Sequence, residues 1–354
     1  MGRFELLEKA FHRFVPDQAY ETFVEKNKKW LEDYSLYMAI KNSLGGIAWS
    51  EWEAPLKTRQ EAALEEKRVE LKEQMDFICF QQYEFAKQWE KLKQYANEKG
   101  IQIIGDIPIY VAFDSADAWA NPELFQFDEN STPLAVAGCP PDAFAATGQL
   151  WGNPLYRWDY HAQTGYVWWI SRLRHCFTLY DVVRVDHFRG FDEYYAIPYG
   201  DKTAENGVWK KGPGIDLFHT VKKELGDVNI IAEDLGYLTE SVMKLVEDTG
   251  YPGMKVLQFA FDSREESNYL PHNYPHNCVV YTGTHDNDTT RGWYETLRDD
   301  CKHKLRRYLH AADTDTISLQ LIRLCLSSTA AYAIFPLQDV LDIGKEGRMN
   351  MPGR

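Results

Sequence analysis

The amino-acid sequence predicts an α/β protein whose parallel sheet forms a (β/α) barrel. Short apolar or β-branched runs alternate with sequence of helical period, which is typical of βαβ units. No Gly-x-Gly-x-x-Gly or Gly-x-x-x-x-Gly-Lys-Ser/Thr motif follows any of these runs, so the usual nucleotide signatures of an open sheet are missing. Several runs end on carboxylates, and in a barrel all strand ends meet on the face that holds the active site. The sequence therefore favours a barrel over a doubly wound sheet.

Seven segments are expected as strands, and several of them precede a helix. The expected strands are residues 77–80, 101–106, 182–186, 229–234, 254–259, 279–283 and 333–337. Helical periodicity is found at residues 83–98, 216–226, 239–248 and 316–328, and also at 4–46 and 54–75 near the N-terminus. We expect a helical subdomain over residues 1–75 and a barrel over residues 76–354, with a long insertion at 112–175.

Composition and charge exclude several classes of function. The 354 residues include 39 Lys and Arg against 53 Asp and Glu, a net charge of −14 that would repel nucleic acid and anionic membranes. The hydrophobic fraction of 44% and charged fraction of 26% argue against disorder and against a membrane protein. The sequence shows no bilayer-spanning run and no secretory signal at its N-terminus, so we expect a cytoplasmic protein. The six cysteines form no Cys-x-x-Cys pair and are expected to be reduced.

Aromatic residues are the unusual part of the composition, because 18 Phe, 11 Trp and 21 Tyr are present. Flat aromatic faces stack on the C–H faces of sugar rings, although most such residues simply fill the core. Trp151 and the pair Trp168-Trp169 lie in turn-rich sequence, where core packing is the weaker explanation.

Two carboxylates end consecutive expected strands, Asp186 after residues 182–185 and Glu233 after 229–232. Neighbouring strands lie about 4.7 to 4.9 Å apart, so we expect these carboxyl groups about 5 to 6 Å apart. Retaining glycoside chemistry places a nucleophile and a general acid/base at about that separation, and inverting enzymes need a wider gap. Arg184 lies on the same side of its strand as Asp186 and is suited to keep that carboxylate ionised. The alternative for Arg184 and Asp186 is a surface ion pair.

A third polar cluster, residues 281–289, follows a later strand. Its Asp-x-Asp sequence invites a metal interpretation, but an EF-hand loop counted from Asp286 would need Gly and Glu where this chain has Arg291 and Leu297. We therefore expect no metal. Asp286 and His285 are suited instead to hydrogen-bond sugar hydroxyls and to support positive charge in an oxocarbenium-like transition state.

The candidate residues belong to longer sequence motifs, which are distributed over nearly the whole chain. They are Gly105–Val111, Gly138–Asp142, Gly148–Pro154, Arg184–Phe191, Ala232–Gly236, Gly283–Thr289, Pro336–Asp339 and Arg348–Asn350. Together and in this order they resemble the 4-α-glucanotransferases (amylomaltases or disproportionating enzymes), glycoside hydrolase family 77. The resemblance implies an α-amylase-like TIM (β/α)8 barrel enzyme. Such an enzyme breaks an α-1,4-glucosidic bond, holds the glucan on an aspartate and transfers it to another sugar's 4-hydroxyl.

The resemblance also implies roles for individual residues. Asp186 matches the nucleophile, Glu233 the general acid/base and Asp286 the transition-state carboxylate. The residues expected to bind substrate are Arg184, His285, Asp106, Asp142, Gln149, Trp151 and Asn153, the last four within the 112–175 insertion that covers the glucan cleft. No cofactor is implied. The expected partners are maltooligosaccharides or other α-1,4-glucans, with glucose or a glucan as acceptor, and the sequence does not define an oligomeric state.

Family members normally have well over a hundred further residues before this pattern, and a short segment after it. We therefore expect an incomplete barrel of seven strands with exposed edges near residues 77–81 and 333–337. On this expectation the chain shows little turnover unless the missing segment is supplied. Two alternatives to a transferase stay open, namely an inactive fragment or glucan-binding remnant, and an α-glucan hydrolase in which water replaces the acceptor.

Overall fold

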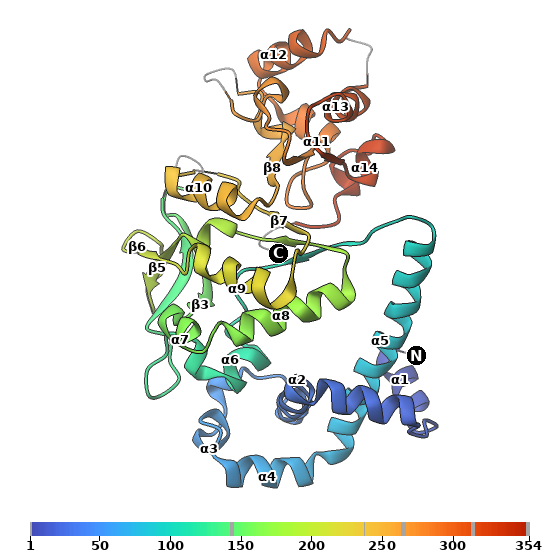
Figure 1. The fold of residues 1–354 in the computed structure, drawn as a ribbon, viewed down its shortest axis with the longest axis vertical. Helices are drawn as coiled ribbons and strands as arrows, with labels where there is room; N and C mark the ends of the chain where they lie inside the picture. The colour runs from blue at the N-terminus through green and yellow to red at the C-terminus, as the bar shows by residue number, and fades with distance from the viewer. Residues whose placement is uncertain (1, 142–144, 237, 263–266, 313–315, 352–354) are drawn as a thin grey trace. The chain divides into compact units, whose positions relative to one another are not determined.

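The computed structural model describes residues 2–141, 145–236, 238–262, 267–312 and 316–351 (Figure 1). The chain divides into two compact units. Unit 1 comprises Met1–Val183 and Gly190–Val228, and unit 2 comprises Arg184–Arg189 and Asn229–Arg354. In the described ranges, no helix is both long enough and apolar enough to cross a membrane.

Helices form the N-terminal part of unit 1. Helix α2 (Gln18–Ser43) begins at Asp17, whose carboxylate accepts the Tyr20 N–H at 2.9 Å. It ends before Gly45 and Gly46, which both have positive φ, and it packs against α5 (Lys72–Glu98). The other helices of unit 1 are α1 (Arg3–Phe11), α3 (Ala54–Lys57), α4 (Glu61–Glu70), α6 (Ala116–Ala120), α7 (Trp158–Gln163), α8 (Val167–Leu179) and α9 (Ile215–Leu225), with 3-10 turns η1 (Trp49–Glu51) and η2 (Pro122–Leu124).

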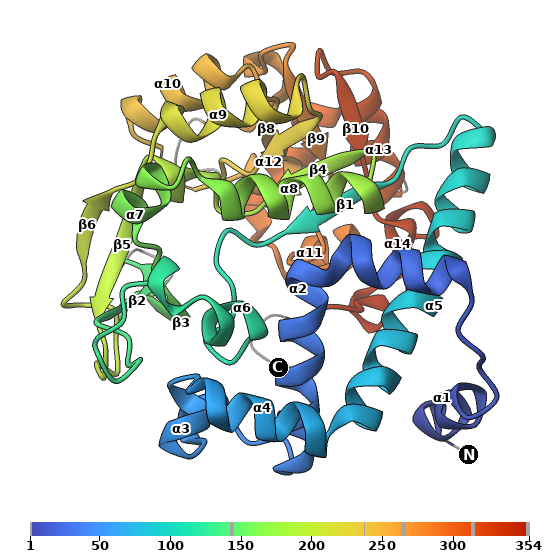
Figure 2. The same cartoon turned by 60° about the horizontal axis from the view of Figure 1, so that its bottom comes forward.

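Unit 1 also contains an antiparallel sheet that the sequence analysis did not predict. Its strands have the order β3-β2-β5-β6, and Figure 2 shows the four strands together at one side of the view. Val136 of β2 pairs with Ile197 of β5, and Tyr195 of β5 pairs with Trp209 of β6. The strands are β2 (Ala135–Cys139), β3 (Gln149–Pro154), β5 (Glu193–Pro198) and β6 (Val208–Lys211).

The remaining strands form two three-stranded sheets. The first has the order β1-β4-β7, with β1 (Ile104–Ile107), β4 (Val182–Val185) and β7 (Ile230–Ala232), and the boundary between the units runs through β4. The second, within unit 2, has the order β10-β9-β8 and is parallel, with β8 (Gly253–Val256), β9 (Cys278–Tyr281) and β10 (Tyr332–Ile334). All residues of β7 and β9 are buried, as is typical of strands covered on both faces.

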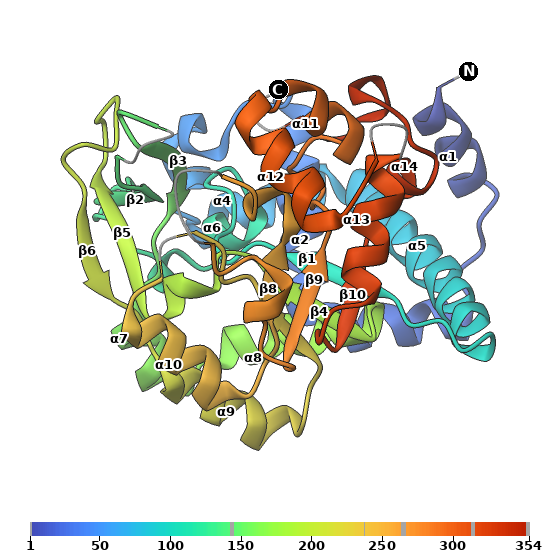
Figure 3. The same cartoon turned by 90° about the horizontal axis from the view of Figure 1, so that it is seen from above.

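Helices cover the strands of unit 2. Helix α13 (Ile317–Leu326) buries Ile317, Leu321, Ile322 and Cys325, which recur at helical spacing on one face. Ile317, Leu321 and Cys325 belong to one core cluster with Val280 of β9 and Phe261. Figure 3 shows α13 beside β10. The other helices are α10 (Glu240–Thr249), α11 (Thr290–Thr296), α12 (Asp299–Leu309) and α14 (Leu337–Val340), with 3-10 turns η4 (Leu257–Phe259), η5 (Pro271–Asn273) and η6 (Lys345–Gly347). A further 3-10 turn, η3 (Phe188–Phe191), follows β4.

One expected strand is wrong. Residues 77–80 belong to α5, where Ile78, Phe80 and Tyr83 are buried. A four-residue apolar run does not distinguish a strand from a buried helical segment. Here neither Gly nor Pro interrupts the chain between Pro55 and Gly100, so the helix continues through the run. The exposed edge expected near residues 77–81 is therefore also wrong. Strand β10 lies at one end of the order β10-β9-β8, and its exposed edge in an incomplete barrel stays a prediction.

The other six expected strands are confirmed as β1, β4, β7, β8, β9 and β10. The α/β class is confirmed, but the strands are assigned to separate sheets and closure into a barrel stays a prediction. The expected division at residue 75 falls inside α5, and it too stays a prediction.

The pair Trp168-Trp169 lies in α8 and not in a loop. The side chain of Trp169 is 1% exposed and stacks with Trp158 at 6.2 Å between ring centroids. Core packing therefore explains Trp169, contrary to the expectation from its turn-rich flanks. Trp151, in contrast, is 37% exposed.

Candidate active site

Backbone hydrogen bonds join the chain after β4 to the chain after β7. The Glu233 N–H donates to the Val185 carbonyl at 3.1 Å, and the Phe188 N–H donates to the Glu233 carbonyl at 3.0 Å. Strand β4 ends at Val185 and β7 ends at Ala232, so Asp186 and Glu233 directly follow neighbouring strands. All of these residues belong to unit 2. The separation of 5 to 6 Å between the two carboxyl groups stays a prediction.

Arg184 holds the carboxylate of Asp186. The guanidinium Nη2 donates to Asp186 Oδ1 at 2.9 Å, and Arg184 Nε lies 3.3 Å from the sulfur of Met254 on β8. The Arg184 side chain is only 9% exposed, whereas that of Asp186 is 42% exposed. This pair is therefore not a surface ion pair. A buried guanidinium on a half-exposed carboxylate favours the ionised form of that carboxylate and leaves it accessible.

Glu233 is the buried member of the carboxylate pair, with 9% of its surface exposed. Its Oε2 accepts the His187 N–H at 2.7 Å, and its Oε1 accepts the Leu235 N–H at 2.8 Å. Burial, and then the negative charge of Asp186, raise the pKa of Glu233 to about 7, although the two N–H donors and Arg184 oppose the shift. A carboxyl group with this pKa can give and take a proton near neutral pH.

His187 has a backbone conformation that sequence reasoning did not identify. Its φ of 51° lies in the left-handed region, which is uncommon for residues other than glycine. The chain turns sharply there, directly after Asp186, and the same turn directs the His187 N–H to Glu233. Strained backbone of this kind collects at functional sites. Burial, and then the charge of Arg189, lower the pKa of the His187 imidazole to about 3.

The turn between β9 and α11 holds His285 and Asp286. His285 Nε2 lies 3.5 Å from Asp286 Oδ2. Two residues from the C-terminal end of the described chain bind the same turn: Asn350 Nδ2 donates to Asp286 Oδ1 at 3.0 Å and to the His285 carbonyl at 3.1 Å, and Arg348 donates to the Asp286 carbonyl at 2.6 Å. Sequence reasoning missed these contacts, because they join residues more than sixty positions apart. The only signal was that Arg348–Asn350 formed one of the motifs.

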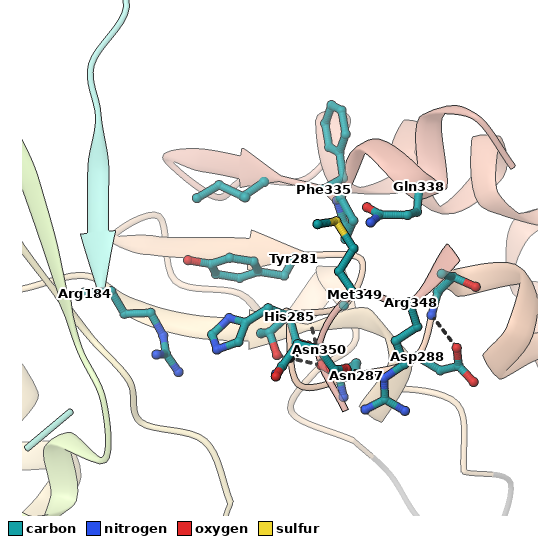
Figure 4. A pocket seen from close by; sticks show the side chains of 15 residues that line it. Arg184, Tyr281, His285, Asn287, Asp288, Phe335, Gln338, Arg348, Met349 and Asn350 are labelled. Carbon is teal, nitrogen blue, oxygen red and sulfur yellow. Dashed lines mark hydrogen bonds between the residues drawn. The ribbon is translucent and has the colours of Figure 1, made fainter. Parts of the chain in front are cut away.

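A pocket of about 340 Å³ in unit 2 brings several of these segments together. Arg184 lines it from the end of β4, His285 from the turn after β9, and Asn350 from the C-terminal segment (Figure 4). Tyr281 and Phe335 supply aromatic faces, which suit sugar rings. The three carboxylates themselves do not line it. Within the described ranges, no group of three or more His, Cys, Asp or Glu side chains is arranged to hold a metal ion.

The other predicted substrate residues belong to unit 1 or lie outside the described residues. Asp106 is exposed on β1. Gln149, Trp151 and Asn153 belong to β3, which is irregular here, because Gly152 has a φ of 80° and the register against β2 shifts between Val136 and Gly138. The indole N–H of Trp151 donates to Gln149 Oε1 at 3.0 Å, and Asn153 Nδ2 donates to the Val111 carbonyl at 2.9 Å. Asp142 lies outside the described residues.

Comparison with known proteins identifies the family to which this α/β chain is similar. A family model described as 4-alpha-glucanotransferase, glycoside hydrolase family 77, matches residues 2–354. The 4-alpha-glucanotransferase of Clostridium butyricum is 49% identical over 354 residues, which are 99% of this chain and 73% of that protein. That of Thermus thermophilus is 48% identical over 361 residues, covering 98% of this chain and 72% of the relative.

A solved structure gives the same result in three dimensions. The amylomaltase from Streptococcus agalactiae in complex with acarbose superimposes with a TM-score of 0.96 at 42% identity, covering 99% of this chain and 72% of that one. The fold is that of an α/β protein of the amylomaltase type. Within that class, the chain belongs to the 4-alpha-glucanotransferase family, glycoside hydrolase family 77.

Proposed function

We propose that this chain transfers α-1,4-glucan segments between maltooligosaccharides by a retaining double displacement. The observation that supports this most is the pairing of Glu233, whose pKa is about 7, with Asp186, which is held by Arg184. One group is poised to exchange a proton and the other is suited to remain an anion. A retaining mechanism requires one carboxylate as nucleophile and one carboxyl group as general acid and base.

In the first step, Asp186 attacks the anomeric carbon of the donor glucan and forms a glycosyl ester. Protonated Glu233 gives its proton to the glycosidic oxygen, so that the leaving sugar departs with a neutral 4-hydroxyl. In the second step, ionised Glu233 removes a proton from the acceptor's 4-hydroxyl as that oxygen displaces Asp186. One carboxyl group therefore performs both proton transfers, and the reaction regenerates the enzyme without a cofactor.

Asp286 is proposed to stabilise the positive charge that develops on the donor sugar in both steps. Arg184 and His285 are proposed to orient that sugar, and their joint position on the pocket supports this assignment. For Asp106, Asp142, Gln149, Trp151 and Asn153, we propose binding of the glucan beyond the reacting sugar. The exposed indole of Trp151 on β3 supports a stacking role there.

The proposal extends to the fold and the cellular setting. We propose that the six strands β1, β4, β7, β8, β9 and β10 belong to an α-amylase-like (β/α) barrel, as the similarity to the amylomaltase structure supports. We also propose that residues 1–75 form a helical subdomain and that residues 112–175 form an insertion that covers the glucan cleft. A cytoplasmic location is proposed from the sequence alone.

Hydrolysis is the second candidate function, because the Asp186 side chain is 42% exposed and a glycosyl ester on it would be open to water. Counting reducing ends during incubation with maltotriose separates the two functions. Transfer conserves the number of reducing ends while chain lengths redistribute, whereas each hydrolytic event adds one. We expect redistribution to dominate. A rise in reducing ends that matches every bond broken would establish a hydrolase, and unchanged maltotriose would contradict both functions.

A further inference from the structure

The turn that holds Asp286 is anchored at both of its ends by one buried carboxylate. Asp339 of α14 is 0% exposed. Its Oδ2 accepts the hydroxyl of Thr282 at 2.6 Å and that of Thr290 at 2.7 Å, and its Oδ1 accepts the Thr290 N–H at 2.8 Å. Thr282 directly follows β9 and Thr290 begins α11, so the two threonines bracket residues 283–289. Both threonines are 0% exposed.

The partners of Asp339 are unusual for a buried carboxylate. Among the described residues they are two hydroxyl groups and one backbone N–H, with no ion-paired cation. Burying a carboxylate in this way is a poor means of stabilising a fold, because an apolar residue of similar size would avoid its desolvation. The carboxylate does fix the relative position of two backbone segments, since three donors converge on two oxygens. We call these three hydrogen bonds from Thr282 and Thr290 to Asp339 the clamp.

The interior of the turn has bonds of its own, and Asn350 and Arg348 also bind it from the C-terminal segment. Asn287 Oδ1 accepts the N–H and the hydroxyl of Thr284 at 2.8 and 2.9 Å, so the tip is internally braced. From β8 and its following turn, Gln258 Nε2 donates to the Asp288 carbonyl at 2.9 Å. The positions at which the turn enters and leaves its neighbours are set at Thr282 and Thr290. Thr282 and Thr290 are therefore the two points at which the segment that carries His285 and Asp286 is joined to β9 and α11.

We propose that Asp339 is a positioning residue, which sets the place of the Asp286 carboxylate by clamping Thr282 and Thr290. The inference rests on the proposed function, in which Asp286 stabilises the transition state. It assigns Asp339 no contact with substrate. Because misplacing a catalytic group affects the transition state more than substrate binding, the loss of the clamp lowers kcat and leaves KM nearly unchanged.

The test removes one donor at a time without changing shape. Thr282→Val and Thr290→Val each delete a hydroxyl that Asp339 accepts, and Thr282→Ser and Thr290→Ser restore it. The matched control is Ser318→Ala on α13. Ser318 is 1% exposed, and its hydroxyl donates to a different carboxylate, Asp342 Oδ1, at 2.8 Å. Thermal melts identify a temperature at which every variant is folded.

We expect each valine variant to lower kcat on maltotriose by about 10- to 100-fold, with KM changed by less than about threefold. The serine variants and Ser318→Ala are expected to stay within about twofold of the unmodified chain in kcat. Valine variants that keep their kcat would overturn the proposal. The proposal would also be overturned if Ser318→Ala lost as much kcat as the valine variants for the same fall in melting temperature. The loss of kcat would then follow from lower stability and not from the loss of the bonds to Asp339.

Hydrogen exchange separates this proposal from the proposed function. Peptides that cover residues 283–289 should exchange faster in both valine variants than in the unmodified chain or in Ser318→Ala. If the unmodified chain shows no transfer, the proposed function fails, and the exchange rates still decide whether Asp339 clamps the turn. Unchanged exchange over residues 283–289 in both valine variants contradicts the clamp whatever the activity.

Discussion

At the scale of single residues, the paired environments of Asp186 and Glu233 are the main finding. Both are carboxylic acids on neighbouring strand ends, yet one contacts a buried guanidinium and the other is buried against two backbone N–H groups. The first environment favours the anion and the second raises the pKa. Two carboxyl groups thus become suited to different steps of one reaction.

Replacement of Asp186 by Asn tests the nucleophile. The amide cannot form a glycosyl ester, so we expect transfer to fall by at least about 10³-fold with the fold intact. A matched control is Asp248→Asn on α10, which breaks the ion pair of Asp248 with Lys244, an equally short pair at 2.9 Å on the surface of the same unit. The measurement is maltotriose turnover. Activity above a few per cent, with deamidation excluded by mass, would end the assignment of Asp186.

The pKa of Glu233 predicts how the rate depends on pH. Glu233 must be protonated to release the leaving sugar, so kcat/KM should fall as the pH rises through about 7, the pKa of the free enzyme. With α-glucosyl fluoride, whose leaving group needs little protonation, the alkaline fall in the first step should be much weaker. Identical alkaline limbs for both donors would show that Glu233 is not the acid.

The same pKa predicts a dependence of stability on pH. The folded pKa of about 7 lies above the ordinary value of 4.5, so the folded chain binds more protons between these values. Stability from this group is therefore full below about pH 4.5 and is lost as the pH rises through 7, by at most about 3 kcal/mol. In Glu233→Gln this slope should disappear from denaturant unfolding measured at several pH values. An unchanged slope would mean that Glu233 is not buried as the structure has it.

At the scale of structural elements, the turn of residues 283–289 packs closely against Gln258. We therefore expect a larger side chain at Gly283 to lower both transfer activity and stability. A Cβ at this position would lie 2.5 Å from Gln258 Nε2, the atom that donates to the Asp288 carbonyl. Gly283→Ala should therefore displace Gln258 and lower transfer about tenfold or more, with a loss of stability of about 1 to 3 kcal/mol. Gly2→Ala, before α1, is a control, because a Cβ there would meet no atom within 4 Å and the φ of Gly2 is −73°. Normal activity in Gly283→Ala would show that the turn tolerates movement.

Elements also show what the sequence could predict. The strands that end at Asp186 and Glu233 were predictable, because a short β-branched run closing on a carboxylate is a local pattern. Residues 77–80 were mispredicted, since the same local pattern occurs inside a long helix. The antiparallel sheet was missed because Val136 pairs with Ile197, and nothing near either residue indicates the other. The bonds from Asn350 and Arg348 to the Asp286 turn were missed for the same reason, because the residues that they join lie far apart in the sequence.

At the scale of the whole molecule, the net charge of −14 makes a prediction about substrate class. Maltooligosaccharides are uncharged, so long-range electrostatics should not steer them to the site. Between about 0.05 and 0.5 M NaCl, a range over which surface charges become strongly screened, we expect kcat/KM for maltotriose to change less than about twofold. A steep dependence on salt would point to a charged substrate and against a neutral glucan.

The central claim is that Asp186 holds the glucan covalently while Glu233 manages the proton, and trapping that intermediate tests it most directly. In Glu233→Gln, α-glucosyl fluoride should still glycosylate Asp186, because fluoride leaves without much protonation, but the base needed to release the sugar is missing. Mass analysis of the digested protein should then find one glucosyl unit on the peptide that contains Asp186. If no adduct forms while the unmodified chain consumes the fluoride, or if the glucosyl unit is found on another residue, the double displacement through Asp186 is contradicted.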